Sequence, residues 1–144
     1  MVTPHRAQQS KIVERLAQIF HHTGATRAAI RDAVDTVERF QGQQRDVILA
    51  SYAVGDSDTI GDEVEFLHSL NRFNVLATRA RAKLVVLLSE QVVHYMAGDI
   101  AVLRDSQLLK SYAETFCAQR RPMQLGVIES GQSRTVDGSF RWHS

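Results

Sequence analysis

The sequence is poor in cysteine: Cys117 is the only one among 144 residues, which excludes a disulfide framework and a cysteine-based metal site. The six histidines show no HxxxH spacing, so the sequence offers no such histidine pair for a metal. No apolar run approaches about 18 residues, and no signal peptide is recognisable. These absences predict a soluble, cytoplasmic protein with no membrane partner and no metal site.

A large excess of one charge is also lacking. The chain carries 17 lysines and arginines against 16 aspartates and glutamates, which gives a formal net charge of +1. Any contact with nucleic acid must therefore come from a local patch, because there is no global basic field. A chain of this length is sufficient for one domain with its own core.

The stretch Asn71–Leu88 is the most informative part of the chain. Its first half carries apolar residues at the i, i+4 and i+7 spacing of one helix face. These residues are Phe73, Ala77 and Ala80. The unbroken apolar run Leu84–Leu88 is too short for a helix and is typical of a strand buried on both faces. The stretch therefore predicts a helix that leads into a central strand.

Three arginines lie on this helix and just after it. Arg72 and Arg79 are seven residues apart and share a face, whereas Arg81 points to nearly the opposite side from Arg79. A guanidinium that leaves the last turn of such a helix can be presented to an anion, because its fork fits phosphate oxygens. From the spacing alone, ordinary solvated charges remain the alternative.

The segments before this stretch predict a helix and two strands. Thr3 as N-cap and Pro4 as first helical residue predict a helix that ends near Gly24. Its apolar face consists of Ile12, Leu16, Ile19 and Phe20. The alternation in Ala28–Val37 predicts a half-exposed strand, and the apolar run Asp46–Tyr52 predicts a buried one.

The remaining segments give weaker signals. Gly55–Glu63 is rich in Gly, Asp and Ser and predicts a loop. Ser89–Tyr95 predicts a short helix, and Asp105–Phe116 predicts a longer one that Pro122 ends.

Two alternating segments near the end of the chain, Met123–Ile128 and Thr135–Trp142, predict a β-hairpin. Phe140 and Trp142 share one face of its second strand. They could stack a nucleic-acid base, and packing against the domain is the alternative that we favour from the sequence.

Three segments resemble motifs of superfamily 1 helicases, in the branch related to the nonsense-decay and Okazaki-fragment helicases. Asn71–Lys83 resembles motif VI, roughly R-R-F/L-N-V-A-x-T-R-A-R, and contains its Thr-Arg-Ala-Arg at Thr78–Arg81. Thr36–Asp46, TVERFQGQQRD, resembles motif V, T-V-D/E-x-F-Q-G-x-E-x-D. Val2–Gln8, VTPHRAQ, resembles motif IV, in which a strand ends in T-P-Y/H before a helix.

This resemblance implies an α/β fold of the P-loop NTPase superfamily. We expect the second RecA-like domain, a parallel sheet with flanking helices, and a small C-terminal β-hairpin. The resemblance covers residues 1–90, which are expected to form part of that domain. Residues 91–144 are expected to complete or extend the same domain.

The resemblance also implies roles for individual residues. The family arginine that matches Arg79 reaches the γ-phosphate as an arginine finger, so Arg79 is the expected catalytic residue. The motif V threonine of the family contacts a phosphate of the bound strand, so Thr36 and Val37 are the expected nucleic-acid contacts. The expected nucleotide contacts are His5, Arg6, Gln8, Gln41, Gly42, Gln44 and Arg79. Gln44 stands where several members carry a ribose-binding glutamate, and it lacks that residue's charge.

The 144 residues contain neither a G-x-x-x-x-G-K-[ST] loop nor a strand that ends in paired acidic residues. In the family these elements lie on the first RecA-like domain. The resemblance therefore implies that ATP and Mg²⁺ bind only together with that domain, and that this chain alone is not an ATPase.

The expected function is that of the C-terminal part of an ATP-dependent DNA or RNA helicase. The chain would supply the arginine finger and part of the track for single-stranded nucleic acid, with the first RecA-like domain as its partner. The alternative is a stand-alone, non-catalytic module, derived from the same domain, that binds nucleic acid or a protein.

Only Met1 and Val2 correspond to the strand that precedes motif IV in the family. From this we expect a chain that is cut inside its sheet, with unpaired backbone groups on a neighbouring strand. An open sheet edge of this kind predicts self-association.

Overall fold

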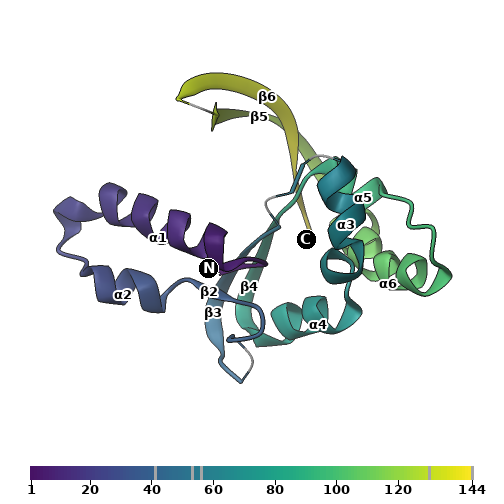
Figure 1. The fold of residues 1–144 in the computed structure, drawn as a ribbon, viewed down its shortest axis with the longest axis horizontal. Coiled ribbons are helices and arrows are strands. Elements are labelled where there is room, and N and C mark those ends of the chain that lie inside the picture. Colours follow the sequence, from purple (N-terminus) through teal and green to yellow (C-terminus); the bar gives the residue numbers. More distant parts are fainter. Residues whose placement is uncertain (41, 53, 56, 130, 144) are drawn as a thin grey trace.

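The computed structural model describes residues 1–40, 42–52, 54–55, 57–129 and 131–143. Its centre is a parallel four-stranded sheet in the order β2-β1-β3-β4, and a separate antiparallel hairpin follows (Figure 1). The strands are β1 (Val2–Thr3), β2 (Asp35–Thr36), β3 (Arg45–Ser51), β4 (Ala80–Leu87), β5 (Gln119–Glu129) and β6 (Gln132–Trp142). The expected RecA-like α/β architecture with a C-terminal hairpin is confirmed.

Helices lie on both sides of this sheet (Figure 1). The connections β1–β2 and β3–β4 run in opposite directions along the sheet, so right-handed crossovers place their helices on opposite faces. The helices are α1 (Arg6–Ile19), α2 (Arg27–Asp32), α3 (Ser57–Leu67), α4 (Leu70–Arg79), α5 (Glu90–His94) and α6 (Ile100–Ser111). None of the described helices has the length and apolar character needed to cross a membrane.

Three apolar clusters hold these layers together. The cluster of α1 and α2 contains Val13, Ile30 and Val34. The cluster between α4 and the sheet contains Val2, Val37, Phe40, Ile48, Ala50 and Leu76. The cluster among α3, α4, α5 and α6 contains Tyr52, Val54, Ile60, Leu67, Phe73, Val92 and Leu109. Since α4 contributes to two of the clusters, it joins the sheet to the C-terminal helices.

The helix expected before β4 is confirmed as α4, but its buried face differs from the expectation. Phe73 and Leu76 are buried, whereas Ala77 is exposed and Ala80 already belongs to β4. The i, i+3 pair Phe73 and Leu76 lies on one helix face and offers more apolar surface than the two alanines. The helix therefore turns this pair to the core.

The expectation that β3 and β4 are buried on both faces is wrong. Ile48 and Ala50 lie beneath α4, but on the other face Val47, Leu49 and Leu87 are 52%, 41% and 53% exposed. The reason is the crossover geometry. Helix α1, which follows β1, packs mainly against β1 and β2.

Residues 28–37 do not form the expected strand. Most of them lie in or after α2, which Thr26 caps by accepting a hydrogen bond from the backbone N–H of Ala29 at 3.2 Å. Ile30 and Val34 are four residues apart, a spacing that fits a helical period as well as an alternating strand. Only Asp35–Thr36 pairs in the sheet.

The loop expected at residues 55–63 is largely helical. Ile60, Val64 and Leu67 recur at helical spacing in α3, and Ile60 and Leu67 are buried. Asp58 in the first turn also suits the positive end of the helix dipole. The Gly- and Asp-rich composition concealed this pattern.

The first helix begins at Arg6, two residues later than expected. Thr3 belongs to β1, and its hydroxyl donates to the carbonyl oxygen of His5 at 3.1 Å instead of capping the helix. Val13 is buried, whereas Ile19 at the end of the helix is exposed, as is Phe20 after it. Gly24 has the left-handed φ of 74° that favours glycine at a stop.

The C-terminal helices and the hairpin largely follow the expectation. α5 and both hairpin strands are confirmed. The longer helix starts earlier, at Ile100, because Asp99 Oδ1 accepts from the backbone N–H groups of Ala101 (2.7 Å) and Val102 (3.1 Å). Pro122 lies in β5 and therefore does not end the helix.

A row of aromatic rings connects α4 to the hairpin. Phe73 contacts Tyr112 with ring centroids 5.1 Å apart, Tyr112 stacks on Phe116 at 5.7 Å, and Phe116 stacks on His143 at 4.1 Å. His143 directly follows β6. The row thus holds the C-terminal end of the hairpin against the helical layer.

We expect Leu76→Ala to lower the free energy of unfolding by about 2–5 kcal/mol, because it leaves a cavity at a buried position on the face of α4 that packs against the sheet. Leu87→Ala, on the exposed face of β4, is the matched control and should cost less than about 1 kcal/mol. Urea unfolding followed by circular dichroism measures both. Equal losses would contradict this assignment of the two sheet faces.

Candidate functional site

The expected site residues lie at two opposite ends of the sheet. His5 and Thr36 stand at the carboxyl ends of β1 and β2, whereas Gly42 and Gln44 precede β3 and Arg79 precedes β4. All four strands are parallel, and the seven residues of β3 span about 20 Å. We call these ends the carboxyl edge and the amino edge. Gln41, a further expected nucleotide contact, lies outside the described residues.

Two of the three motif VI arginines are ion-paired. Arg72 Nε lies 3.1 Å from Glu38 Oε1, and its guanidinium carbon is 3.8 Å from the centroid of the Phe66 ring. Arg81 donates to Asp46 Oδ1 through both Nε (2.9 Å) and a terminal nitrogen (2.6 Å). Both guanidinium groups are therefore engaged by carboxylates of the chain itself.

Arg79 differs from these two arginines. It is the last residue of α4 and is half-buried, and its Nε is fully buried without a hydrogen-bond partner. No ion pair joins it to another of the described residues. Leaving a buried donor unpaired costs about 1–3 kcal/mol. The amino edge therefore contains a guanidinium that no described carboxylate neutralises, and an anion reaches its Nε only if the surrounding side chains move.

Backbone close to Arg79 in the sheet is open to a ligand. β3 and β4 begin side by side, with Arg45 opposite Ala80. Gly42, in the turn before β3, has a left-handed φ of 85°, and no heavy atom lies within 4 Å of where a Cβ would stand. The side chain of Gln44 is exposed. The amino edge thus combines a free guanidinium, an exposed amide and approachable backbone.

The carboxyl edge is more crowded. His5 Nε2 lies 2.7 Å from Glu63 Oε2, and the imidazole stacks on Phe66 with centroids 5.5 Å apart. Gln8 donates to Ser51 Oγ at 3.0 Å, while its own Oε1 is buried without a partner. Arg6 is exposed on the first turn of α1.

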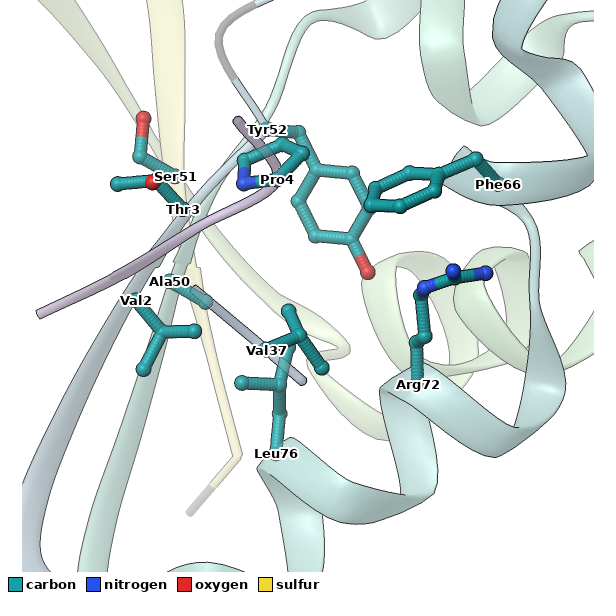
Figure 2. A pocket seen from close by; sticks show the side chains of 10 residues that line it. All are labelled: Val2, Thr3, Pro4, Val37, Ala50, Ser51, Tyr52, Phe66, Arg72 and Leu76. Carbon is teal, nitrogen blue, oxygen red and sulfur yellow. The ribbon is translucent and has the colours of Figure 1, made fainter. Parts of the chain in front are cut away.

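A small cavity opens beside these residues (Figure 2). Its volume is about 20 Å³, which is room for about one water molecule and far too little for a nucleotide. Tyr52, Phe66 and Arg72 lie at one end of it in Figure 2. Burial raises the pKa of Tyr52 to about 12, so its hydroxyl stays neutral.

The expected nucleic-acid contacts at this edge are largely covered. Thr36 is 5% exposed and Val37 is 8% exposed. Val37 packs in one cluster with Phe40 and Leu76, which gives it a structural role. Of the five expected site residues at the carboxyl edge, Arg6 is exposed, His5 and Gln8 are half-buried, and Thr36 and Val37 are buried.

Glu38 has a carboxyl group whose pKa lies below its ordinary value of 4.5. Its partial burial acts to raise the pKa. Hydrogen bonds from its own backbone, from Arg72 and from Thr36, together with the charge of Arg72, outweigh that effect. The carboxylate is therefore ionised at neutral pH and keeps Arg72 occupied.

The partners of Arg72 and His5 were not predicted from the sequence. Glu38 stands at the acidic position of motif V, so a signal for it was present. Glu63 ends, and Phe66 follows, a segment that was interpreted as a loop, so no pattern pointed to either. In the part of the chain that the structure describes, no group of three or more His, Cys, Asp or Glu could hold a metal ion.

Comparison with known proteins agrees with the sheet and the motif positions. The sequence model of a family described as "AAA domain" matches residues 1–91, which include motifs IV, V and VI. The chain belongs to this family. The three motifs therefore all lie within the part of the chain that this family covers.

Curated relatives are helicases by name. The chain is 34% identical over 87 residues to "Probable helicase senataxin" of Homo sapiens, and 32% identical over 89 residues to "Helicase SEN1" of Saccharomyces cerevisiae. It is also 33% identical over 88 residues to "DNA replication ATP-dependent helicase/nuclease DNA2" of Bos taurus.

These alignments cover 60% of the chain, but only 3%, 4% and 7% of the three relatives. They confirm the resemblance of this AAA domain to superfamily 1 helicases. The roles expected for individual residues stay predictions.

The Glu38–Arg72 pair predicts a pH dependence of stability. Because the folded pKa of Glu38 is depressed, the pair stabilises the fold above about pH 4.5, and this stabilisation is lost as the pH falls through the folded pKa. We expect Arg72→Gln to lower the free energy of unfolding at pH 7 by less than about 1 kcal/mol, since the pair is partly exposed. The difference from wild type should shrink below about pH 4.

A Glu38→Gln background is the control. There, Arg72→Gln should have an effect that does not change between about pH 3 and pH 7, because no titrating partner is left. Chemical unfolding across this range measures both effects. A wild-type advantage that persists unchanged in acid would contradict the proposed role of the Glu38 carboxylate.

Proposed function

We propose that this chain is the second RecA-like half of an ATP-dependent superfamily 1 helicase, with Arg79 as its arginine finger. One observation carries the proposal: among the described residues Arg79 has no partner, whereas the neighbouring Arg72 and Arg81 are ion-paired. An interaction module without hydrolysis has no need of an unpaired, partly buried arginine at this edge. The name of one relative, an ATP-dependent helicase/nuclease, supports the same function.

The residues of the amino edge fit the phosphates of ATP. When bound, ATP supplies the phosphoryl group whose transfer to water drives such motors. Arg79 can hold the charge on the phosphate oxygens without giving up an internal partner, and its planar fork suits them. Gly42 allows close backbone approach, and the Gln44 amide can hydrogen-bond to a ribose hydroxyl without charge assistance. The Mg²⁺ ion and the phosphate cradle belong to the first RecA-like domain.

We assign the carboxyl edge to single-stranded DNA or RNA. His5, Arg6 and Gln8 lie on the same edge as Thr36, about 20 Å along the strands from Gly42 and Arg79. This separation favours a nucleic-acid role for the three motif IV residues over the nucleotide role that the motif resemblance implied. Because Thr36 is buried, the first phosphate contact is expected at the exposed guanidinium of Arg6.

The test of Arg79 supplies the missing half of the site. With the first RecA-like domain of a related helicase joined to this chain, Arg79→Ala and Arg79→Lys should lower ATP turnover by about 10³-fold or more. Lysine lacks the planar fork and should not restore it. Nucleic-acid binding should change little, because that surface lies at the other edge. A coupled phosphate-release assay measures the turnover.

Arg81→Ala is the matched control, since Arg81 is already paired with Asp46, and it should retain most of the activity. The chain without the first domain should release no phosphate above background. Normal turnover in Arg79→Ala, combined with a crippled Arg81→Ala, would show that the wrong arginine has been assigned.

Binding of single-stranded nucleic acid tests the carboxyl edge. We expect weak, sequence-tolerant binding whose affinity falls with salt. Arg6→Gln should reduce the slope of log affinity against log salt by about 0.7, the value for one phosphate contact on a single strand. Arg15→Gln, on the same helix and also exposed, should leave the slope unchanged. Equal slopes for both variants would remove Arg6 from the track.

A further inference from the structure

The hairpin β5-β6, which projects from the body in Figure 1, has one apolar and one polar face. Directly paired residues of an antiparallel ladder share a face, and successive residues alternate between faces. The apolar face carries Met123, Leu125, Val127, Val136, Phe140 and Trp142. A two-stranded hairpin gains little stability alone, so an exposed apolar face of this kind points to a binding surface.

Aromatic rings gather at the end of this face next to the body. Phe140 and Trp142 stack with centroids 5.5 Å apart and an interplanar angle of 22°, and they are 52% and 37% exposed. Phe140 is therefore about half exposed, whereas most of Trp142 is covered, so the packing favoured from the sequence accounts for part of their surface. Each ring covers the inner face of the other, so the pair, which we call the platform, offers the outer faces of its rings to solvent.

One arginine shares the face of this platform, and two lie on the opposite face of the hairpin. Arg121 is opposite Phe140 in the ladder and shares its face, while Arg120 is opposite Arg141 on the other face. Like charges directly opposite each other destabilise a sheet, so folding alone gives no reason for the Arg120–Arg141 pair. The only acidic group paired with any of them is Glu90 of α5, whose Oε1 is 3.9 Å from Arg120 among the described residues. The arrangement attracts an anion.

Stacked aromatic rings beside guanidinium groups suit one class of ligand. Single-stranded nucleic acid offers bases that stack on exposed rings and phosphates that pair with arginine. A purely apolar partner would be complementary to Met123 and Leu125, but it would leave Arg121, the arginine on that face, without a counterpart. The charge pattern therefore favours nucleic acid over a protein or a second copy of this chain.

We propose that Phe140 and Trp142, together with Arg121, form a second binding surface for single-stranded nucleic acid, outside the helicase motifs. Bases stack on the two rings, and the guanidinium of Arg121 contacts the backbone phosphates. The surface lies beyond residues 1–91, which the AAA-domain family covers. It rests on the proposed function only in taking nucleic acid as the ligand.

The aromatic row from Phe73 to His143 fixes this surface relative to motif VI. Phe73 lies on α4, six residues before Arg79, and His143 directly follows Trp142. A strand held on the hairpin is therefore held at a defined position with respect to the helix that carries the expected arginine finger. The base of the hairpin is therefore packed against the body of the domain.

Trp142 is the only tryptophan of the chain, so it reports directly on stacking at this surface. Titration of the 144-residue chain with a deoxythymidine oligomer of about 12 nucleotides should quench its fluorescence. Phe140→Ala should weaken binding by about fivefold or more, through the loss of one stacking ring. Arg121→Gln should lower the salt slope of binding by about 0.7. Trp142→Phe keeps a ring and should retain most of the affinity, measured by anisotropy of a labelled oligomer.

Two matched variants serve as controls. Arg104→Gln removes one exposed positive charge from α6 and should change neither the quenching nor the salt slope. Ile128→Ala removes an exposed apolar side chain from the opposite face of the hairpin and should leave affinity unchanged. Melting curves for every variant confirm that the fold is retained.

Three outcomes would overturn the proposal. The first is saturable binding without quenching of Trp142, and the second is unchanged affinity in Phe140→Ala. The third is a tryptophan signal that changes with protein concentration in the absence of any oligonucleotide, because such a signal indicates self-association through the apolar face. The first two leave the proposed helicase function intact, because Arg6 and the carboxyl edge can still bind the strand. A failure of the Arg79 test would instead affect only the proposed function.

Discussion

The guanidinium of Arg72 ties together three segments that are far apart in the sequence. It pairs with Glu38 from the crossover between β2 and β3, it lies over Phe66 from α3, and it belongs to α4 itself. His5 reaches the other partners of this cluster by stacking on Phe66 and pairing with Glu63. Motifs IV, V and VI therefore meet in one polar and aromatic cluster at the carboxyl edge.

This use of Arg72, together with the pairing of Arg81 and Asp46, explains why charge at the amino edge is concentrated on Arg79. A carboxylate near Arg79 would lower its cost in the free protein, but it would also compete with any incoming phosphate. The structure keeps the carboxylates at its two neighbours. Two arginines stabilise the fold, and the third keeps its hydrogen-bonding capacity for a ligand.

The resemblance to the helicase motifs predicted the parallel sheet, and the pattern of apolar residues predicted that α4 and the hairpin exist. It failed at α2, where Ile30 and Val34 satisfy both a helical and a strand period, and at α3, where Gly and Asp concealed the spacing of Ile60 and Leu67. It could not separate the two edges, since the order of residues along a chain does not say at which end of a sheet a turn lies. The open face of β3 and β4 likewise depends on how far a neighbouring helix reaches, which no local pattern encodes.

The seven residues of β3 act as a stiff rod that begins beside Arg79 and ends beside Gln8. A rod of about 20 Å that tilts by about 10° moves its far end by about 3.5 Å. That displacement is close to the rise of about 3.4 Å between consecutive nucleotides in one strand. Under the function proposed above, a rotation of the whole domain by about 10° about the amino edge would therefore move the carboxyl edge by about one nucleotide.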